Sequence, residues 1–369
     1  MHALNLFILS RCLSRTIAST RKEMIYHAHI QFMTLHLSRR KFIKAGAAFV
    51  LVFKNDRPLS VITVNGSIPA TAMGTTLVHE HFLVDFIGAD KIDYSRWNRD
   101  EIVKKVLPYL LDAKKHGVKT ILDCTPAFLG RDVVLQKRLA KESGLNILTN
   151  TGYYGAVANK YLPQWVFAET HEQIAKIWIN EFENGIENTT VKPGFIKIGV
   201  DGPHLSELHQ KIVRAAAITH LQTGMTICSH TGIAIPAFEE IELLKEMKVH
   251  PSAFVWTHAQ VEQDRSLHVK AAKAGAWISL DGIGWGGFDK YADSMDNLRL
   301  AGLLNKVLIS HDAGWYKPGE KDGGEFVGYT NIFIELLPLL KKRGFSDNDI
   351  EQVLVKNPAE AFGIRVRKV

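Results

Sequence analysis

The chain contains few cysteines, and their spacing excludes two common kinds of stabilising site. Only three are present in 369 residues. They are Cys12, Cys124 and Cys228, which lie too far apart in the sequence to indicate a disulfide framework or a cysteine-rich zinc site.

The body of the chain also lacks a surplus of either charge. The net charge of +7 arises in the first 57 residues, which hold ten Lys or Arg against two acids, whereas the remainder holds 35 against 36. A nucleic-acid-binding protein carries its basic footprint on the folded domain. We therefore expect no nucleic-acid partner.

Residues 1–58 are expected to form a leader. Residues 38–53 read SRRKFIKAGAAFVLVF, in which a twin arginine, an aromatic residue and a lysine precede nine apolar residues. This is the pattern of a bacterial twin-arginine signal and predicts export to the periplasm, while the apolar run is too short for a membrane span. No Ala-x-Ala cleavage site follows, and 37 residues precede the motif, which a true start at Met33 would explain. The alternative is a basic tail on a cytoplasmic enzyme.

Residues 59–369 alternate between apolar runs typical of strands and amphipathic segments typical of helices. After a short extended segment at 60–68, strands are expected at 75–82, 118–125, 146–153, 194–200, 225–231, 253–259, 276–282 and 307–313. Helices are expected at 99–116, 131–143, 171–185, 207–223, 236–248, 264–274, 330–342 and 347–355. This order predicts one α/β domain, a (β/α)8 TIM barrel.

Two histidines end the first predicted strand. His79 and His81 are separated by one residue, and residues i and i+2 of a strand point to the same face. The pair can therefore place two imidazoles on one metal ion, although ordinary surface or core histidines would have the same spacing.

Polar residues recur where other predicted strands end. Lys197 lies on the fourth strand, His230 on the fifth, His258 on the sixth and Asp312 on the eighth. TIM-barrel enzymes carry out catalysis at this rim. Agreement among five strand ends favours a metal site over packing.

Lys197 is unusual in this set because its neighbours Phe195, Ile196 and Ile198 are apolar. An uncompensated ammonium group is costly in such a setting, and divalent metal ions bound nearby, two of them in a two-metal site, would repel it. A lysine that forms a Schiff base with a substrate would explain the apolar setting, but that chemistry has no use for four histidines and an aspartate.

The order His-x-His, Lys, His, His, Asp resembles that of the phosphotriesterase family of the amidohydrolase superfamily, from about Ile62 to Ile364. The resemblance implies two divalent metal ions, for which zinc suits the ligands best and manganese or cobalt can substitute. By resemblance, the more buried ion is bound by His79, His81 and Asp312, and the more exposed one by His230 and His258. Lys197, carboxylated by carbon dioxide, would bridge both ions. The resemblance also suggests a homodimer.

The activity implied by this resemblance is hydrolysis of a small-molecule ester by a metal-bridging hydroxide. Two cations make hydroxide available near neutral pH and polarise the carbonyl or phosphoryl oxygen of the substrate. Asp312 would be catalytic, orienting the hydroxide and accepting its proton, or would act as a ligand only.

Two positions near the expected site bear on the substrate. Tyr154 matches a tyrosine that lactonase members of the family place beside the metals, so we assign it a catalytic role and favour lactones or carboxyl esters. Gly282 occupies the position where lactonase relatives have arginine and organophosphate relatives have histidine, and we expect Trp285 to fill part of the space. Residues 313–328 are expected to form a mobile loop over the site or a surface connection.

The sequence thus predicts a two-metal hydrolase that cleaves lactones, other carboxyl esters or phosphotriesters. The alternatives are a phosphodiesterase or nuclease-like barrel hydrolase and an inactive metal-binding relative.

Overall fold

The eight predicted barrel strands are all present and parallel in the computed structural model, which describes residues 58–285 and 287–369. The predicted leader lies outside the described residues, apart from its last residue, and Pro58–Val369 is one compact unit. The barrel strands are Thr76–Leu83 (β3), Thr120–Asp123 (β4), Asn146–Leu148 and Asn150–Thr151 (β5 and β6), Phe195–Gly199 (β7), Ile227–His230 (β8), Phe254–Thr257 (β9), Trp277–Leu280 (β10) and Val307–Ile309 (β11).

These strands follow the chain order around a closed ring. β5 pairs with β4 and β6 pairs with β7, so the two short segments together form the third barrel strand. The ring closes between the first and last strands, where the Asp312 backbone N–H donates to the His79 carbonyl at 3.0 Å. The predicted (β/α)8 barrel is confirmed.

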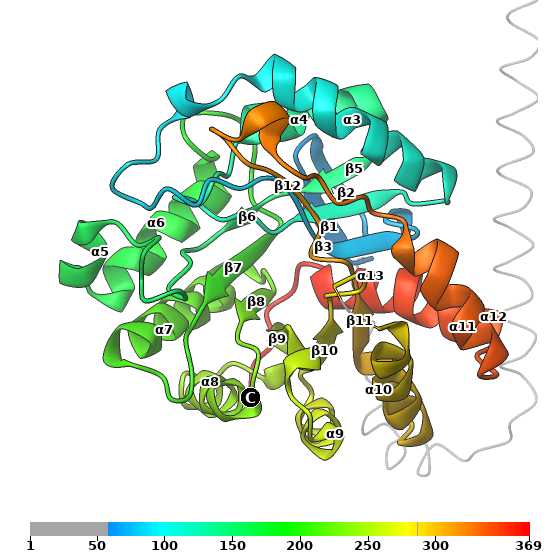
Figure 1. Ribbon diagram of the computed structural model, residues 1–369. Helices are drawn as coiled ribbons and strands as arrows, with labels where there is room; N and C mark the ends of the chain where they lie inside the picture. Colours follow the sequence, from blue (N-terminus) through cyan, green and yellow to red (C-terminus); the bar gives the residue numbers. More distant parts are fainter. Residues whose placement is uncertain (1–57, 286) are drawn as a thin grey trace, which may run out of the picture. The chain divides into compact units, whose positions relative to one another are not determined.

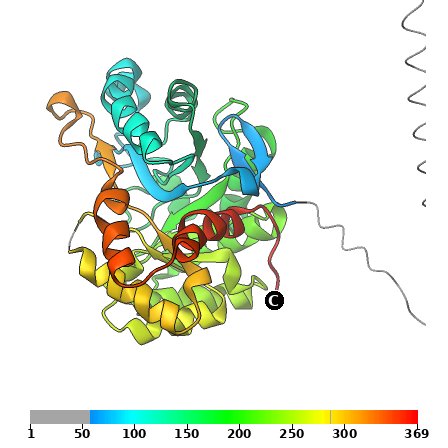
Figure 2. The same ribbon diagram turned by 90° about the vertical axis from the view of Figure 1, so that its right-hand side faces the viewer.

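Helices surround the strands, as Figure 1 shows. They are Arg99–Lys115 (α3), Val133–Ser143 (α4), Gln164–Ala168 (α5), His171–Asn184 (α6), Glu207–Thr223 (α7), Ala234–Glu246 (α8), Arg265–Ala274 (α9), Phe288–Leu300 (α10), Leu337–Lys342 (α11), Asp347–Glu351 (α12) and Asn357–Phe362 (α13), with π-helical turns at Ile332–Leu336 and Gln352–Lys356. In the view of Figure 2, α3 (cyan) lies above the strands and α10 (yellow) below them. None of the helices in the described part of the chain has the length and apolar character needed to cross a membrane.

Local sequence explains most of the helix ends. The side chains of Asn98, Asp132 and Ser206 cap the first turns of α3, α4 and α7, and Gly144 and Gly224 end α4 and α7 in the left-handed conformation, which glycine adopts without steric cost. The short helices α5 and α13 and the longer α10 add to those expected. α10 begins after Gly287 without a side-chain cap, so the usual start signal is missing.

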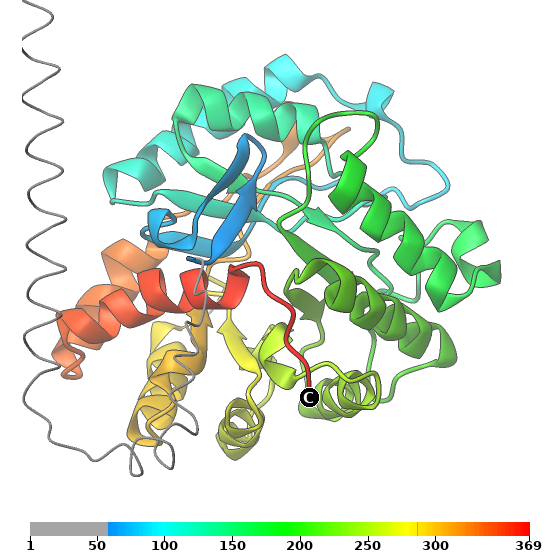
Figure 3. The ribbon, with the colours of Figure 1, turned by 180° about the vertical axis from the view of Figure 1, so that it is seen from behind.

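One layer of apolar side chains fills the barrel below the site. Each barrel strand contributes to it: Val78, Leu122, Leu148, Phe195, Cys228, Val255, Trp277 and Leu308. The hairpin of Ser60–Thr63 (β1) and Gly66–Pro69 (β2) closes this end of the barrel together with α13, and both lie there in the rear view of Figure 3.

The same layer explains where the functional side chains point. Side chains two residues apart on a strand share a face, so Lys197 follows Phe195 and His230 follows Cys228 into the barrel. β3 differs, because neighbouring Val78 and His79 both face the interior. A register shift in the β3–β4 pairing, between Leu77 and Glu80, makes this arrangement possible, and such bulges re-aim side chains next to active sites.

The segment after β11 is partly a strand. Gly314–Tyr316 (β12) pairs in parallel with β3, Gly314 opposite His81 and Tyr316 opposite Leu83. The expectation of a mobile loop is therefore wrong for these three residues, which extend the sheet at the mouth of the barrel.

Candidate metal centre

The six predicted metal-binding residues line a single cavity at the C-terminal ends of the strands. The cavity measures about 80 Å³, and Tyr154 lines it as well. His79, His81, Lys197 and His258 are each at most 8% exposed. Residues from strands that are far apart in sequence are thus brought together as the strand-end argument predicted.

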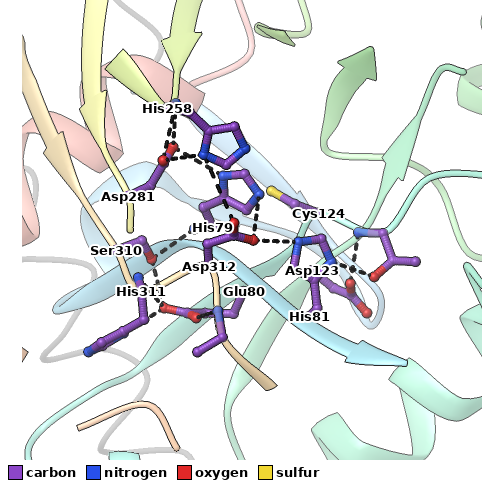
Figure 4. Close-up of polar contacts among 12 residues, drawn as sticks. His79, Glu80, His81, Asp123, Cys124, His258, Asp281, Ser310, His311 and Asp312 are labelled. Carbon is purple, nitrogen blue, oxygen red and sulfur yellow. Dashed lines mark hydrogen bonds and ion pairs between the residues drawn. The ribbon is translucent and has the colours of Figure 1, made fainter. Parts of the chain in front are cut away.

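His79, His81 and Asp312 form the tightest group. One donor atom from each lies within 4.8 Å of the others. The Asp312 Oδ1 atom is 3.0 Å from His81 Nε2 and 3.5 Å from His79 Nε2 (Figure 4). Two imidazole nitrogens and a carboxylate oxygen that converge on one point suit a divalent metal ion.

Three further side chains face this group: Lys197 from β7, His230 from β8 and His258 from the end of β9. The rings of His230 and His258 are 4.4 Å apart between centroids. Lys197 is 1% exposed, and no ion pair or hydrogen bond joins its ammonium group to another described residue. A buried ammonium group without a counter-ion is costly, so this side chain needs a further partner.

Asp281, at the end of β10, is a functional residue that the sequence analysis missed. Its Oδ2 accepts from His79 Nδ1 at 3.1 Å and its Oδ1 from His258 Nδ1 at 2.8 Å (Figure 4). Asp281 therefore orients two metal-ligand candidates and leaves the Nε2 atom of each facing away from it. The signal in the sequence was an acidic residue two positions after Ser279, on the inward face of an apolar strand.

His79, His258 and Asp281 also lie close enough together to hold an ion. We interpret them as a hydrogen-bonded group instead, because both Nδ1 atoms already donate to a carboxylate that is fully buried. His81 has a similar partner, since its Nδ1 lies 2.8 Å from the Thr125 hydroxyl.

Glu80 points away from the cavity, as expected for the residue between two inward-facing histidines. Its buried carboxylate accepts from the Ser310 hydroxyl at 2.8 Å, from His311 Nδ1 at 2.7 Å and from the Ala313 N–H at 3.0 Å (Figure 4). These bonds hold the chain on both sides of Asp312, whose φ of +52° is uncommon for a residue other than glycine.

The charge states of His230 and Asp312 suit metal binding. Burial lowers the pKa of His230 well below its usual value, with His258 and Lys197 adding to the effect, so its imidazole is neutral. Burial opposes ionisation of Asp312, but His79 and His81 outweigh it and hold the pKa of this carboxyl below its usual value. Neutral imidazole and ionised carboxylate are the forms that bind metal ions. Burial opposes protonation of His258, but Asp281 outweighs it and raises the pKa of this imidazole, so a cation bound there would have to displace a proton, while the donor set as a whole still fits two cations.

Aromatic side chains enclose the cavity. The Tyr154 ring packs against His230, 5.0 Å between centroids, and the Lys197 Nζ atom lies 5.6 Å from the centre of the same ring. Burial raises the pKa of Tyr154, so its hydroxyl stays protonated. On the other side, Trp315 meets His81 edge-on at 5.8 Å.

Gly282 does not leave the open space that we expected. A Cβ atom there would lie 2.7 Å from the Gln260 amide nitrogen and 2.9 Å from the Tyr291 hydroxyl oxygen. Trp285 instead donates its indole N–H to the carbonyls of His311 and Asp312, at 2.9 and 3.0 Å. The expectation that Trp285 fills the space beside Gly282 is therefore wrong.

Comparison with known proteins agrees with this geometry. The phosphotriesterase family model matches residues 59–362. The phosphotriesterase homology protein of Escherichia coli is 28% identical over 293 residues, which cover 78% of this chain and 98% of that protein. An aryldialkylphosphatase of Saccharolobus solfataricus is 30% identical over 308 residues, with 80% and 97% covered. A phospho-furanose lactonase of Mycoplasmopsis synoviae is 28% identical over 323 residues, with 80% and 89% covered.

The crystal structure of the E. coli phosphotriesterase homology protein, which has phosphate in its active site, aligns with a TM-score of 0.69 at 27% identity, and covers 79% of this chain and 99% of that chain. Sequence, fold and site agree over nearly the whole body of the chain. The chain therefore belongs to the phosphotriesterase family.

Proposed function

We propose that this member of the family hydrolyses uncharged carboxyl esters, with lactones as the main class and phosphotriesters as a secondary one. The observation that carries the proposal is the wall of the cavity. Apart from the candidate metal ligands it is formed by Val84, Phe86, Cys124, Pro126, Leu129, Tyr154, Val157, Tyr161 and Trp315.

Among the residues that line this cavity, Lys197 carries the single lysine or arginine charge. An anionic substituent would enter an apolar wall without a partner there, which is costly. Phosphorylated lactones, such as the name of the M. synoviae relative suggests, are therefore less suitable substrates here than uncharged ones. The volume of about 80 Å³ is well below the ~300–1,000 Å³ of sites for drug-sized ligands. The cavity therefore admits only the reacting group of a substrate and its nearest substituents.

The proposal includes two divalent cations, zinc in the first instance, and a Lys197 side chain carboxylated by carbon dioxide. Carboxylation converts an unpaired buried ammonium group into an anionic oxygen donor, which supports this modification. When bound, the cations would acidify a water molecule and polarise the substrate carbonyl.

The protein's own residues have separate tasks in this proposal. Asp312 is ionised, faces the cavity and is held by backbone hydrogen bonds, so it is placed to accept a proton from the attacking water. Tyr154 keeps its proton and lies beside His230, where its hydroxyl can donate to the ester. Asp281 and Thr125 keep the imidazoles oriented.

The same metal centre could also belong to either of the two alternatives given by the sequence, a different hydrolase or an inactive metal-binding protein. A phosphodiesterase or nuclease-like hydrolase acts on an anionic substrate. Beyond the metal centre, the described residues that line the cavity offer no further cationic side chain to pair with that charge, which disfavours this alternative. An inactive metal-binding relative is disfavoured by the complete set of candidate ligands and by the ionised Asp312.

A substrate panel tests these possibilities. The full chain, loaded separately with zinc, manganese and cobalt, would be assayed on γ- and δ-lactones, aryl esters, a phosphotriester and a phosphodiester, with and without a chelator. Chelator-sensitive turnover of lactones or aryl esters that is lost in Asp312→Asn would support the proposal. A preference for the phosphodiester would favour the first alternative, and no chelator-sensitive turnover would favour the second.

We also propose export through the twin-arginine motif at Arg39 and Arg40 and assembly as a homodimer. The motif itself supports the first proposal and the family resemblance supports the second. Cell fractionation with Arg39→Lys/Arg40→Lys as the control tests export, and light scattering of the purified protein tests the dimer. Export that survives the double change would exclude this route.

A further inference from the structure

A second cavity shares a segment of its wall with the metal centre. Pro126 and Leu129 line the metal cavity, whereas Phe128 and Gly130 of the same segment line the second one. The second cavity measures about 360 Å³ and contains no candidate metal ligand among the described residues that line it. Its volume lies within the ~300–1,000 Å³ typical of sites for small organic ligands, so we asked which ligand chemistry its walls suit.

Four aromatic side chains line this second cavity: Tyr94, Trp97, Phe128 and Tyr153. Tyr94 and Trp97 meet edge-on, 5.4 Å apart between centroids with 74° between the ring planes, and Phe128 lies 5.5 Å from Tyr153 at 53°. Rings at such angles turn their faces in different directions, and the face of an aromatic ring attracts cations. Tyr94 already has one cationic neighbour, because the guanidinium carbon of Arg99 lies 5.6 Å from its ring centre.

The acids of the second cavity outnumber its bases. Among the described residues that line it, Asp93, Glu181 and Glu187 are acidic and Arg131 alone is basic. Arg131 donates to Glu181 at 2.7 and 2.9 Å and to Glu187 at 3.3 Å, so two carboxylates share one guanidinium charge. The Tyr94 hydroxyl also donates to Glu187. These bonds occupy acceptor positions of the carboxylates but leave a surplus of negative charge, and the Glu187 side chain is 41% exposed, so a ligand can approach it.

We propose that the second cavity binds a small organic cation of the quaternary ammonium type, with choline as its simplest probe. A quaternary ammonium group has no N–H to donate, so it does not need the acceptor positions that Arg131 and Tyr94 already occupy. Its charge is attracted both by the aromatic faces and by the surplus carboxylate charge. An anionic ligand would be repelled by the same walls. This site is separate from the metal centre, and the inference does not depend on which bond that centre cleaves.

The test compares choline with 3,3-dimethylbutan-1-ol, which has the same shape but carries carbon in place of the charged nitrogen. Both compounds give a single trimethyl signal, so saturation-transfer NMR titrations of the purified full chain measure their affinities in the same way. Choline should bind about tenfold more tightly than the alcohol, as expected for a cation held between aromatic faces in a partly desolvated site.

Three variants locate the site. Glu187→Gln keeps an acceptor for the Tyr94 hydroxyl but removes the charge, so it should weaken choline about threefold and leave the alcohol unchanged. Tyr94→Leu keeps an apolar side chain but removes a ring face, so it should lower the preference for choline. Glu183→Gln is the matched control, because Glu183 is an exposed acid four residues before Glu187 that does not line the cavity, and it should keep the full preference.

Equal affinity of the wild type for the two compounds would overturn the proposal. A preference for choline that survives both Glu187→Gln and Tyr94→Leu would overturn it as well, because the cation would then bind elsewhere. Closure of the cavity by a second copy in the proposed homodimer would abolish choline binding and would also count against it. The preference is a ratio measured on one preparation, so a variant that folds incompletely does not distort it.

Discussion

Replacing Asp281 by asparagine tests how the metal centre is organised. The carboxylate accepts hydrogen bonds from the Nδ1 atoms of His79 and His258 and from the Ser279 hydroxyl. Asparagine has the same shape but offers one acceptor oxygen and one donor nitrogen. One of the two imidazoles would therefore face an NH2 group, and it could avoid the clash only by moving its proton from Nδ1 to Nε2.

That proton would occupy the nitrogen that faces the metal. Removal of an orienting partner of this kind typically lowers metal affinity by ~10- to 100-fold, which corresponds to about 1.4–2.7 kcal/mol. The figure agrees with the ~1.5–3 kcal/mol expected for a hydrogen bond to a charged group. We expect Asp281→Asn to reach at least the lower end of this range, because the carboxylate is fully buried and water cannot replace it.

The assay is a competition titration of metal-free protein with zinc against a chromogenic chelator near pH 7. Glu240→Gln is the matched control, because Glu240 is equally buried and bonds to the Thr231 hydroxyl at 2.7 Å but to no histidine. An Asp281→Asn protein that binds both zinc ions as tightly as the wild type would refute the orienting role.

Three further outcomes are expected. Asp312→Asn should lower kcat by ~10²-fold or more, as expected when a general base is removed, while metal analysis finds much of the metal retained; near-normal kcat would remove the proton-accepting role. Glu80→Gln should lower the free energy of unfolding in urea by about 2 kcal/mol, because the oxygen that accepts from the Ala313 N–H would become an NH2 group and leave that donor facing another donor, and an unchanged midpoint would contradict this. Burial raises the pKa of Glu240 from 4.5 to about 8, so between these values the folded protein keeps a proton that the unfolded chain releases. Stability should therefore fall by ~1.4 kcal/mol per pH unit as pH rises towards 8, and Glu240→Gln should remove this part of the slope; parallel stability curves for the two proteins would show that the carboxyl is already ionised.

The barrel and its six candidate ligands could be predicted because both depend on local periodicity. Strand residues two apart share a face, so an inward Phe195 or Cys228 implies an inward Lys197 or His230. β3 is a partial exception, since its register shift brings Val78 and His79 to one side. The His-x-His spacing remained informative because His79 and His81 still line the same cavity.

The role of Asp281 could not be predicted in the same way. An acid at the end of an apolar strand can bind a metal or accept hydrogen bonds, and the sequence does not distinguish the two. The answer depends on where the Nδ1 atoms of His79 and His258 lie, and these histidines come from β3 and the end of β9. Likewise, β12 forms only because β3 offers a free edge to Gly314 and Tyr316, which is a property of the assembled barrel.

Gly282, which stands where related enzymes have arginine or histidine, is connected to the metal centre through its neighbours. A side chain at this position would displace the amide end of Gln260. The Gln260 Oε1 atom accepts from the Asp281 backbone N–H at 3.2 Å, and its amide nitrogen lies 3.4 Å from the Asp281 carboxylate. Since that carboxylate orients His79 and His258, the glycine is part of the packing that supports the ligands. An arginine or histidine at this position would have to displace the Gln260 amide, which contacts the carboxylate that orients both imidazoles, so we expect such a change to alter metal binding together with any substrate contact.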